Sequence, residues 1–177
     1  RLKTEAENRK KMEAEEAIKK EAFLAEFKEV IDTKLAFFET QKKAAQKTAS
    51  GLQYAIYEKG KGKKPANGST VYVHYAGFFE SGELFDSSKE DVSKAFGKFD
   101  QNRADAKAYT PFPFQYGNKT GLIPGFLEGL EKLNFGDKAI LFIPSQLGYG
   151  EAGAGGIIPP NSNLIFEIEL LEELPKQ

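Results

Sequence analysis

Hydrophobic residues between positions 122 and 171 recur first with the period of a helix and then with that of strands. Pro124 stands where proline suits the first turn of a helix, and apolar residues follow at steps of three and four. These residues are Phe126, Leu127, Leu130 and Leu133. Residues 134–136 then end the pattern, so we predict one short helix with a single apolar face.

Two strands are predicted after this helix. Residues 138–144 are apolar on both faces and too few for another helix, which is typical of a buried strand. From residue 164 the pattern alternates, with Glu167 and Glu169 on one face, so we expect an antiparallel strand with one solvated face. Its apolar face carries Leu164, Phe166, Ile168 and Leu170. The rigid Gly- and Pro-rich loop between these strands is expected to fold over the helix and form a concave apolar site.

Strand patterns also precede the helix. Residues 52–57 alternate, residues 70–79 form a second alternating run, and a turn at residues 81–82 returns residues 83–86 as a hairpin. Residues 110–117 contain two prolines that enforce extended geometry, which an edge strand tolerates.

Residues 1–49 differ sharply from the rest of the chain. They hold 12 Lys and Arg and 10 Asp and Glu, with no Gly and no Pro, which favours a long helix. A continuous helix over this arm would be about 60–70 Å long at ~1.5 Å per residue. Thr48 to Gly51 is predicted to end it, with Gly51 as the residue after the C-cap.

From residue 18 onward the arm acquires an apolar face, whereas the residues before 17 offer little to bury. The face carries Phe23, Phe27, Val30, Ile31, Lys34 and Phe38. Either these side chains pack on the following domain, or they pair with a second chain or with a domain upstream. Strict heptads are missing from the sequence, so a coiled coil is not predicted.

Residues 89–110 form a polar connection with three scattered aromatic residues, Phe96, Phe99 and Tyr109. Connections of this length are usually functional or mobile. The sequence leaves two alternatives open, a flap at the rim of a pocket and a surface bulge.

Composition narrows the class of protein. With 177 residues and 15 Phe, the chain can bury one ordinary core and carry an appendage. The net charge of −1 gives no argument for nucleic acid or anionic membranes, and no apolar run is long enough for a membrane span. Cysteine is absent, which excludes a disulfide framework and thiolate chemistry. The first residue is Arg1 rather than Met, so we expect a processed or trimmed product.

Two motifs that suggest other chemistry are set aside. Residues 148–153 match G-x-G-x-x-G, but the paired prolines at 159–160 prevent the helix that a dinucleotide site requires. His74 is the only histidine, and without cysteine or a second histidine it supports neither a metal site nor a Ser-His nucleophile. We expect His74 to be structural, and no metal or cofactor is predicted.

Several separated segments, in order, resemble one family. VHYAGFFESGELFDSS, LIPGFLEGL, GDKAILFIP and LGYGEAGAGGIIPPNSNLIFEIELL are similar to FKBP-type peptidyl-prolyl cis-trans isomerases, over roughly residues 51–174. The resemblance implies an α+β fold in which a curved antiparallel sheet wraps on one short helix. We therefore predict a helical arm over residues 1–49 and an isomerase domain over residues 50–177.

The resemblance also assigns roles within the expected pocket. Residues implied to be catalytic are Tyr75, Phe85, Asp86, Tyr149 and Phe166. Residues implied to bind substrate are Phe112, Ile123, Phe126, Ile157 and Ile158. Phe126 resembles the floor of the proline pocket, and the backbone N–H of Ile123 resembles a donor to a substrate carbonyl. Phe114 could replace Phe112 after a small register change.

Three positions depart from the family pattern. Phe126 stands where many members have tryptophan, and Ala154 stands where a histidine is frequent. Asp91 occupies the usual position of an arginine after Asp86, so Asp86 lacks its ion partner unless Arg103 reaches it. These departures predict weakened affinity for macrolide ligands and lower catalytic efficiency.

The leading interpretation is an enzyme that accelerates X-Pro isomerisation in peptides and unfolded proteins. The alternative is a proline-segment binding module or dimeric holdase chaperone, with the arm used for dimerisation or for docking an upstream domain. The arm and the lack of cysteine favour, weakly, a bacterial folding factor of the periplasm or cell envelope over one of the cytoplasm.

Overall fold

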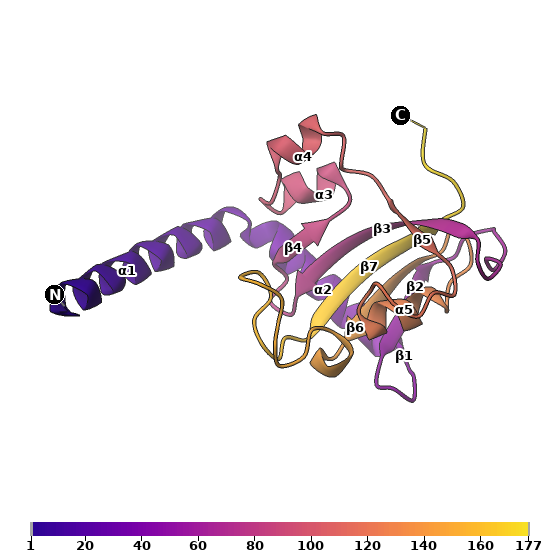
Figure 1. Ribbon diagram of the computed structural model, residues 1–177, viewed down its shortest axis with the longest axis horizontal. Coiled ribbons are helices and arrows are strands. Elements are labelled where there is room, and N and C mark those ends of the chain that lie inside the picture. Colours follow the sequence, from indigo (N-terminus) through magenta and orange to yellow (C-terminus); the bar gives the residue numbers. More distant parts are fainter. Residues whose placement is uncertain (1, 177) are drawn as a thin grey trace.

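The computed structural model describes residues 2–176, and its centre is one seven-stranded antiparallel sheet. The strand order is β1-β2-β6-β7-β3-β4, and β5 pairs with the outer edge of β3 (Figure 1). The strands are β1 Gln46–Lys47, β2 Gln53–Glu58, β3 Thr70–Phe79, β4 Leu84–Ser87, β5 Phe112–Gln115, β6 Lys138–Ile143 and β7 Leu164–Leu171. The predicted α+β fold, a curved antiparallel sheet on one short helix behind a long N-terminal helix, is confirmed.

Five α-helices and one 3-10 turn accompany the sheet in the described part of the chain. They are α1 Leu2–Glu26, α2 Lys28–Ala44, α3 Glu90–Ala95, α4 Gln101–Asp105, α5 Pro124–Leu130 and η1 Ser145–Leu147. None of the helices within residues 2–176 combines the length and the apolar character that crossing a membrane demands.

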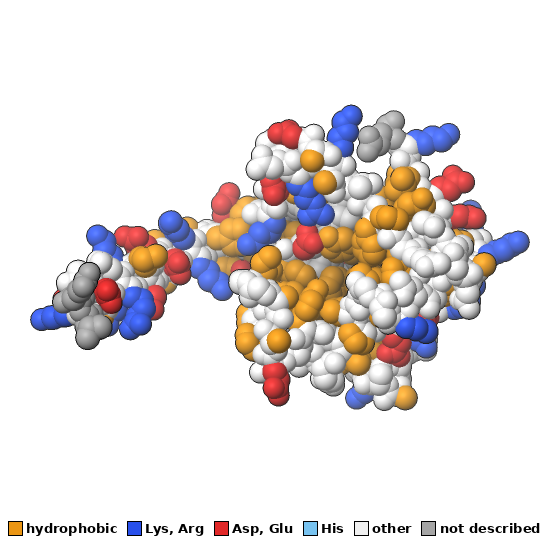
Figure 2. All heavy atoms as spheres, in the orientation of Figure 1, with side chains coloured by type: hydrophobic (Ala, Val, Ile, Leu, Met, Phe, Trp, Pro, Cys, Tyr) orange, Lys and Arg blue, Asp and Glu red, His pale blue; other side chains and the backbone are white. Residues whose placement is uncertain are grey.

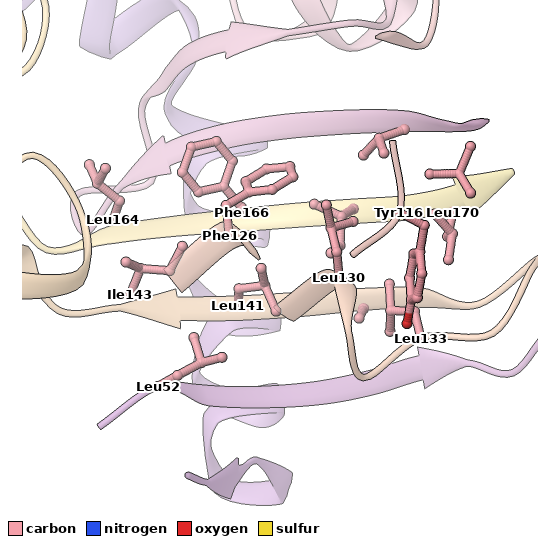
Figure 3. Packing of buried hydrophobic residues seen from close by; sticks show 14 of the residues in the cluster. Leu52, Tyr116, Phe126, Leu130, Leu133, Leu141, Ile143, Leu164, Phe166 and Leu170 are labelled. Carbon is pink, nitrogen blue, oxygen red and sulfur yellow. The ribbon is translucent and has the colours of Figure 1, made fainter. Parts of the chain in front are cut away.

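Helix α5 packs on one face of the sheet and closes the main hydrophobic core. Two glycines on α5 allow this close approach. A Cβ on Gly125 would lie 2.6 Å from Cγ2 of Ile143, and one on Gly129 would lie 2.4 Å from Cδ1 of Leu141. Figure 3 shows the side chains of α5 and of strands β6 and β7 filling the space between helix and sheet. The apolar residues of α5, β6 and β7 recur with the period of their own element, and this period places them on the face that enters the core.

The expectation of a solvated second face on β7 was wrong. Ile165 is 6% exposed, and the Glu167 side chain is only 17% exposed because α2 covers this face. Lys34 of α2 donates to Glu167 across 2.7 Å, which compensates the burial of that carboxylate. The sheet thus has α5 on one face and α2 on the other.

A single continuous helix over residues 1–49 was also wrong. The backbone at Phe27, with φ −102° and ψ 13°, interrupts the arm between α1 and α2, and α2 ends at Ala44. Residues 46–47 instead pair with β2, and Gly51, with φ +105°, belongs to the turn between β1 and β2. Strand pairing therefore overrides the helix propensity of the residues after Ala44.

The apolar face of the arm packs largely on the domain that follows. Ile31 and Phe38 of α2 are buried, and the Phe38 ring meets the Phe78 ring edge to face at 5.3 Å. Residues 7–22 of α1 are exposed, and Figure 1 shows α1 projecting away from the sheet. The first of the two alternatives therefore holds for α2 and for Phe23 at the end of α1, while residues 7–22 stand apart from the domain.

Candidate functional site

The main cavity of the domain lies between α5, strands β3 to β5 and the segment that precedes β5. Its volume is about 700 Å³. Figure 2 shows hydrophobic side chains gathered in a hollow in the middle of the domain. Eight of the ten predicted site residues line this cavity: Tyr75, Phe85, Asp86, Phe112, Ile123, Phe126, Tyr149 and Phe166.

Two perpendicular rings form the inner end of the cavity. Phe126 of α5 and Phe166 of β7 meet edge to face, with centroids 5.1 Å apart and an interplanar angle of 82°. Phe126 is 4% exposed and Phe166 is 6% exposed, so each ring is packed mainly by protein. The ring centroid of Phe112 in β5 lies 6.1 Å from that of Phe126. Phe114, the alternative to Phe112 in the sequence, does not line the cavity.

The aromatic wall stands over a glycine of β3. Gly77 pairs with Phe166 on one side and with Asp86 on the other. A Cβ on Gly77 would lie 2.5 Å from Cζ of Phe85 and 2.8 Å from Cε1 of Phe166. Phe85 and Phe166 therefore share the space above this residue, where their rings meet at 89°. Only glycine leaves room for both rings in this arrangement.

A polar triad edges the cavity. The Tyr75 hydroxyl donates to Oδ2 of Asp86 at 2.5 Å, and the Arg103 guanidinium donates to Oδ1 at 2.7 Å. Arg103 thus supplies the ion partner that Asp86 lacks at the usual spacing. Burial and the hydrogen bond to Asp86 raise the pKa of Tyr75 to about 12. The Tyr75 hydroxyl therefore stays protonated and acts as a donor near neutral pH.

A free backbone donor opens on the same cavity. Ile123 is the N-cap of α5, and its carbonyl accepts from Phe126 and Leu127 at 3.0 and 3.1 Å. Within residues 2–176 the N–H of Ile123 has no protein acceptor. Tyr149, which is 40% exposed, brings a second donor to the cavity wall. A ligand carbonyl in this cavity could therefore replace water at either group.

The two isoleucines of the long loop lie elsewhere. Ile158 is 5% exposed and belongs to the hydrophobic core, and Ile157 is 66% exposed. Neither lines the cavity. A bridge between Ala154 and Ile158 folds the loop back on itself, which turns successive isoleucines to opposite sides.

Sequence reasoning missed most of the wall that residues 103–113 supply. Ala108, Thr110 and Pro111 line the cavity beside Arg103. No local pattern marks these residues as a wall, because the segment is polar and aperiodic. The flap alternative for residues 89–110 is the one that their position favours.

His74 faces away from Tyr75, as strand alternation predicts. Its Nδ1 lies 2.8 Å from Oγ of Ser88, and that oxygen also accepts from the backbone N–H of Tyr75 at 2.8 Å. Burial and the nearby Lys89 lower the pKa of His74. A neutral, hydrogen-bonded imidazole fits the predicted structural role.

Comparison with known proteins places this geometry in a family. A family model described as FKBP-type peptidyl-prolyl cis-trans isomerase matches residues 61–171. The chain is 40% identical over 134 residues to the FKBP-type 22 kDa peptidyl-prolyl cis-trans isomerase of Escherichia coli K12, covering 76% of the chain and 55% of that protein. It is 39% identical over 121 residues to FK506-binding protein 1 of Dictyostelium discoideum, covering 68% of the chain and 96% of that protein.

A solved structure agrees with these relatives. The crystal structure of FkpA from Escherichia coli superposes with a TM-score of 0.54 at 32% identity, covering 93% of the chain and 70% of that structure. The chain spans about half the length of the first bacterial relatives it matches. The segment that the family model matches, residues 61–171, contains every residue that lines the aromatic cavity. The chain belongs to the FKBP-type peptidyl-prolyl cis-trans isomerases.

Proposed function

We propose that this chain catalyses the cis–trans isomerisation of X-Pro bonds in peptides and unfolded proteins. The observation that carries the proposal is an aromatic cavity with a free amide donor at Ile123 on its wall. The X-Pro bond is a slow step in folding because its barrier, about 18–20 kcal/mol, reflects the loss of amide resonance. A site that binds the twisted bond more tightly than the planar one lowers that barrier.

The cavity offers two physical means of doing so. The planar amide is the more charge-separated form and is favoured by water, so a dry aromatic environment weakens that preference. The Ile123 N–H, the Tyr149 hydroxyl and the Asp86 carboxylate supply fixed dipoles and charge for the twisted form. No nucleophile is required, and each ~1.4 kcal/mol removed from the barrier accelerates the reaction about tenfold.

Individual residues receive the following roles in the proposal. Phe126 forms the floor under the proline ring, and the surrounding wall comes from Tyr75, Phe85, Phe112 and Phe166. Ile123 and Tyr149 hold the carbonyl groups of the substrate. Asp86 edges the cleft, Ile157 contacts bound peptide beyond the cavity, and Ile158 supports the loop from the core. The same cavity is proposed to bind macrolides weakly, because Phe126 offers no indole N–H to them.

The test is the protease-coupled cis–trans turnover of a short X-Pro peptide. We expect the intact chain to exceed the uncatalysed rate, Phe166→Ala to lose most of that rate, and Tyr149→Phe to lose part of it. Tyr72→Phe is the matched control, since Tyr72 does not line the cavity. Circular dichroism verifies that each variant is folded. An intact chain that binds the peptide without accelerating its isomerisation would identify a binding module instead.

We also propose that the two parts of the chain divide the work, with residues 50–177 carrying the reaction and residues 1–49 carrying attachment. Met12 and Ile18 of α1 are 60% and 67% exposed on a helix that projects from the domain. Self-association through α1 would cover them. Sedimentation velocity of the intact chain and of Ile18→Glu tests this, because only a dimer held through α1 shifts to monomer in the variant.

A further inference from the structure

Residues 89–110 lie between the helical arm and the aromatic cavity. Figure 1 shows α3 and α4 over β4, beside the junction of α1 and α2. The turn at Gly97 touches the arm, and the part of the segment from Arg103 to Thr110 lines the cavity. The segment is therefore in contact with two regions of the chain that the proposed function treats separately.

On the side of the arm, the segment rests on two phenylalanine rings. Phe23 and Phe27 pack with centroids 4.8 Å apart at the end of α1. A Cβ on Gly97 would lie 2.5 Å from Cε2 of Phe27 and 2.7 Å from Cε2 of Phe23. The Lys98 ammonium lies 4.7 Å from the centre of the Phe23 ring. The backbone at Gly97 therefore packs directly on the two rings of the arm, and a side chain at this position would push the segment away from them.

Local backbone bonds fix this seat. Gly97 has φ +72° and follows α3, where its N–H donates to Lys94 and the N–H of Lys98 donates to Ser93 at 2.8 Å. This pair of bonds is a Schellman motif, which favours glycine at that position. The preceding residue, Phe96, is 6% exposed and meets the Phe78 ring at 5.2 Å. The turn after α3 is therefore held to both the arm and the sheet.

A stacked pair of rings carries the segment onward to the cavity. Phe99 and Tyr109 stack at 6.0 Å with an interplanar angle of 12°, and the Tyr109 hydroxyl accepts from the N–H of Asp100 at 2.9 Å. Asp100 caps α4 by accepting from the N–H groups of Asn102 and Arg103. The Arg103 guanidinium lies 4.6 Å from the centre of the Tyr109 ring. The Tyr109 ring therefore helps to orient the Arg103 side chain toward Asp86.

At the cavity, Arg103 completes the triad with Asp86 and Tyr75. The Arg103 side chain is 27% exposed and the Asp86 side chain is 43% exposed. Charge attraction between two such partly exposed groups stabilises the pair only slightly. Packing of the guanidinium against Tyr109 restricts its freedom and lowers the entropy lost on pairing. The carboxylate of Asp86 is therefore held from a segment whose own position depends on the arm.

We propose that residues 89–110 act as a brace, seated on Phe23 and Phe27, that fixes the Asp86 carboxylate through Arg103. In this proposal, which rests on the proposed isomerase function, Arg103 is a positioning residue that acts through Asp86. The end of α1 then contributes to turnover at a distance, in addition to any part that the exposed face of α1 has in attachment.

Three variants of the full chain test the brace. Phe23→Ala/Phe27→Ala removes the seat, Gly97→Val lifts the segment from it without changing the arm, and Arg103→Met removes the positioning group. We expect each to lower kcat/KM for an X-Pro peptide by about 3- to 10-fold. Lys11→Ala/Glu15→Ala is the matched control, because these exposed side chains of the same helix lie away from the brace, and it should retain the full rate.

A double-mutant cycle separates a brace from independent damage. If the arm acts through Arg103, the combination of Phe23→Ala/Phe27→Ala with Arg103→Met loses no more activity than Arg103→Met alone. Losses that multiply in the combined variant would overturn the proposal. So would an unchanged rate in both Phe23→Ala/Phe27→Ala and Gly97→Val while Arg103→Met is impaired.

A spectroscopic reading keeps the test independent of catalysis. The chain has three arginines, and the Arg103 guanidinium can be assigned in ¹H–¹⁵N spectra by its loss in Arg103→Met. Pairing with Asp86 restricts rotation of the Arg103 guanidinium, so its Nη–H groups should give separate signals. In Phe23→Ala/Phe27→Ala and in Gly97→Val we expect faster rotation to average these signals. A chain without isomerase activity that still shows this averaging would overturn the proposed function and leave the brace intact. Separate Nη signals in both variants would refute the brace.

Discussion

The rings of Phe126 and Phe166 meet edge to face, with their centroids 5.1 Å apart and an interplanar angle of 82°. One ring comes from β7, a strand in the interior of the sheet, and the other from α5, which packs on that face. This perpendicular contact fixes the inner end of the cavity, and the remaining aromatic residues are arranged around it.

The wall beside these rings depends on the missing side chain of Gly77. We expect Gly77→Ala to lower kcat/KM for an X-Pro peptide by at least about tenfold, because the new methyl group would displace Phe85 and Phe166 from their shared position. Turnover measurements on the folded variant check this. Gly156→Ala is the control, since a Cβ there meets nothing within 4 Å. Full activity of Gly77→Ala would show that the two rings need not be fixed.

The charge of Asp86 contributes to the high pKa of Tyr75, which lies at about 12. We expect Asp86→Asn to lower the pKa of Tyr75, because the negative charge that disfavours the tyrosinate is removed. Burial of the phenol, which is the largest cause of the high pKa, and the Arg103 guanidinium, which lowers the pKa, both remain in this variant. Titration of ¹³Cζ-labelled tyrosine measures it. An unchanged pKa of Tyr75 would mean that the charge of Asp86 does not contribute to it.

Asp137 should make stability depend on acid pH. Its buried carboxylate accepts from the N–H groups of Gly60 and Asn134 at 2.8 and 2.9 Å and from Lys59. Burial opposes the charged form, but these hydrogen bonds outweigh it and lower the pKa of Asp137. A lowered folded-state pKa contributes stability above the unfolded value of 3.8, and this contribution is lost as the pH falls through the folded value.

Replacement of that carboxylate gives the corresponding stability test. We expect Asp137→Ala to cost about 2–4 kcal/mol near pH 7, because two buried N–H groups lose a charged acceptor. The loss should shrink as the pH falls below 3.8, where the unfolded chain begins to bind a proton, and should vanish as the pH passes the lower folded-state pKa. Urea unfolding at several pH values measures both effects. Asp32→Ala, which breaks an exposed pair with Lys28, should change stability little.

Helix α2 should be part of the cooperative fold. Phe38→Ala is expected to lower the free energy of unfolding by about 3–5 kcal/mol, because a buried ring packed on Phe78 is removed. Met12→Ala on the exposed part of α1 is expected to have little effect. Urea unfolding followed by circular dichroism compares the two. Equal stabilities would mean that α2 docks without contributing to the fold.

Local periodicity was enough to predict the elements around the cavity. The alternation in residues 70–79 and 164–171 and the helical spacing after Pro124 each depend on the geometry of a single segment. Together with the family motifs, they led to eight of the ten candidate residues that line one cavity. These features could be predicted because each is encoded within about ten consecutive residues.

Only the tertiary structure decided the contacts between distant segments. It paired Lys34 with Glu167, ended α2 at Ala44 in favour of a strand pair, and buried Ile158 while exposing its neighbour Ile157. It also brought Arg103 to Asp86 through a segment with no regular pattern. Such contacts depend on how complete elements pack, and the period of one segment carries no information about which residue of another will lie against it.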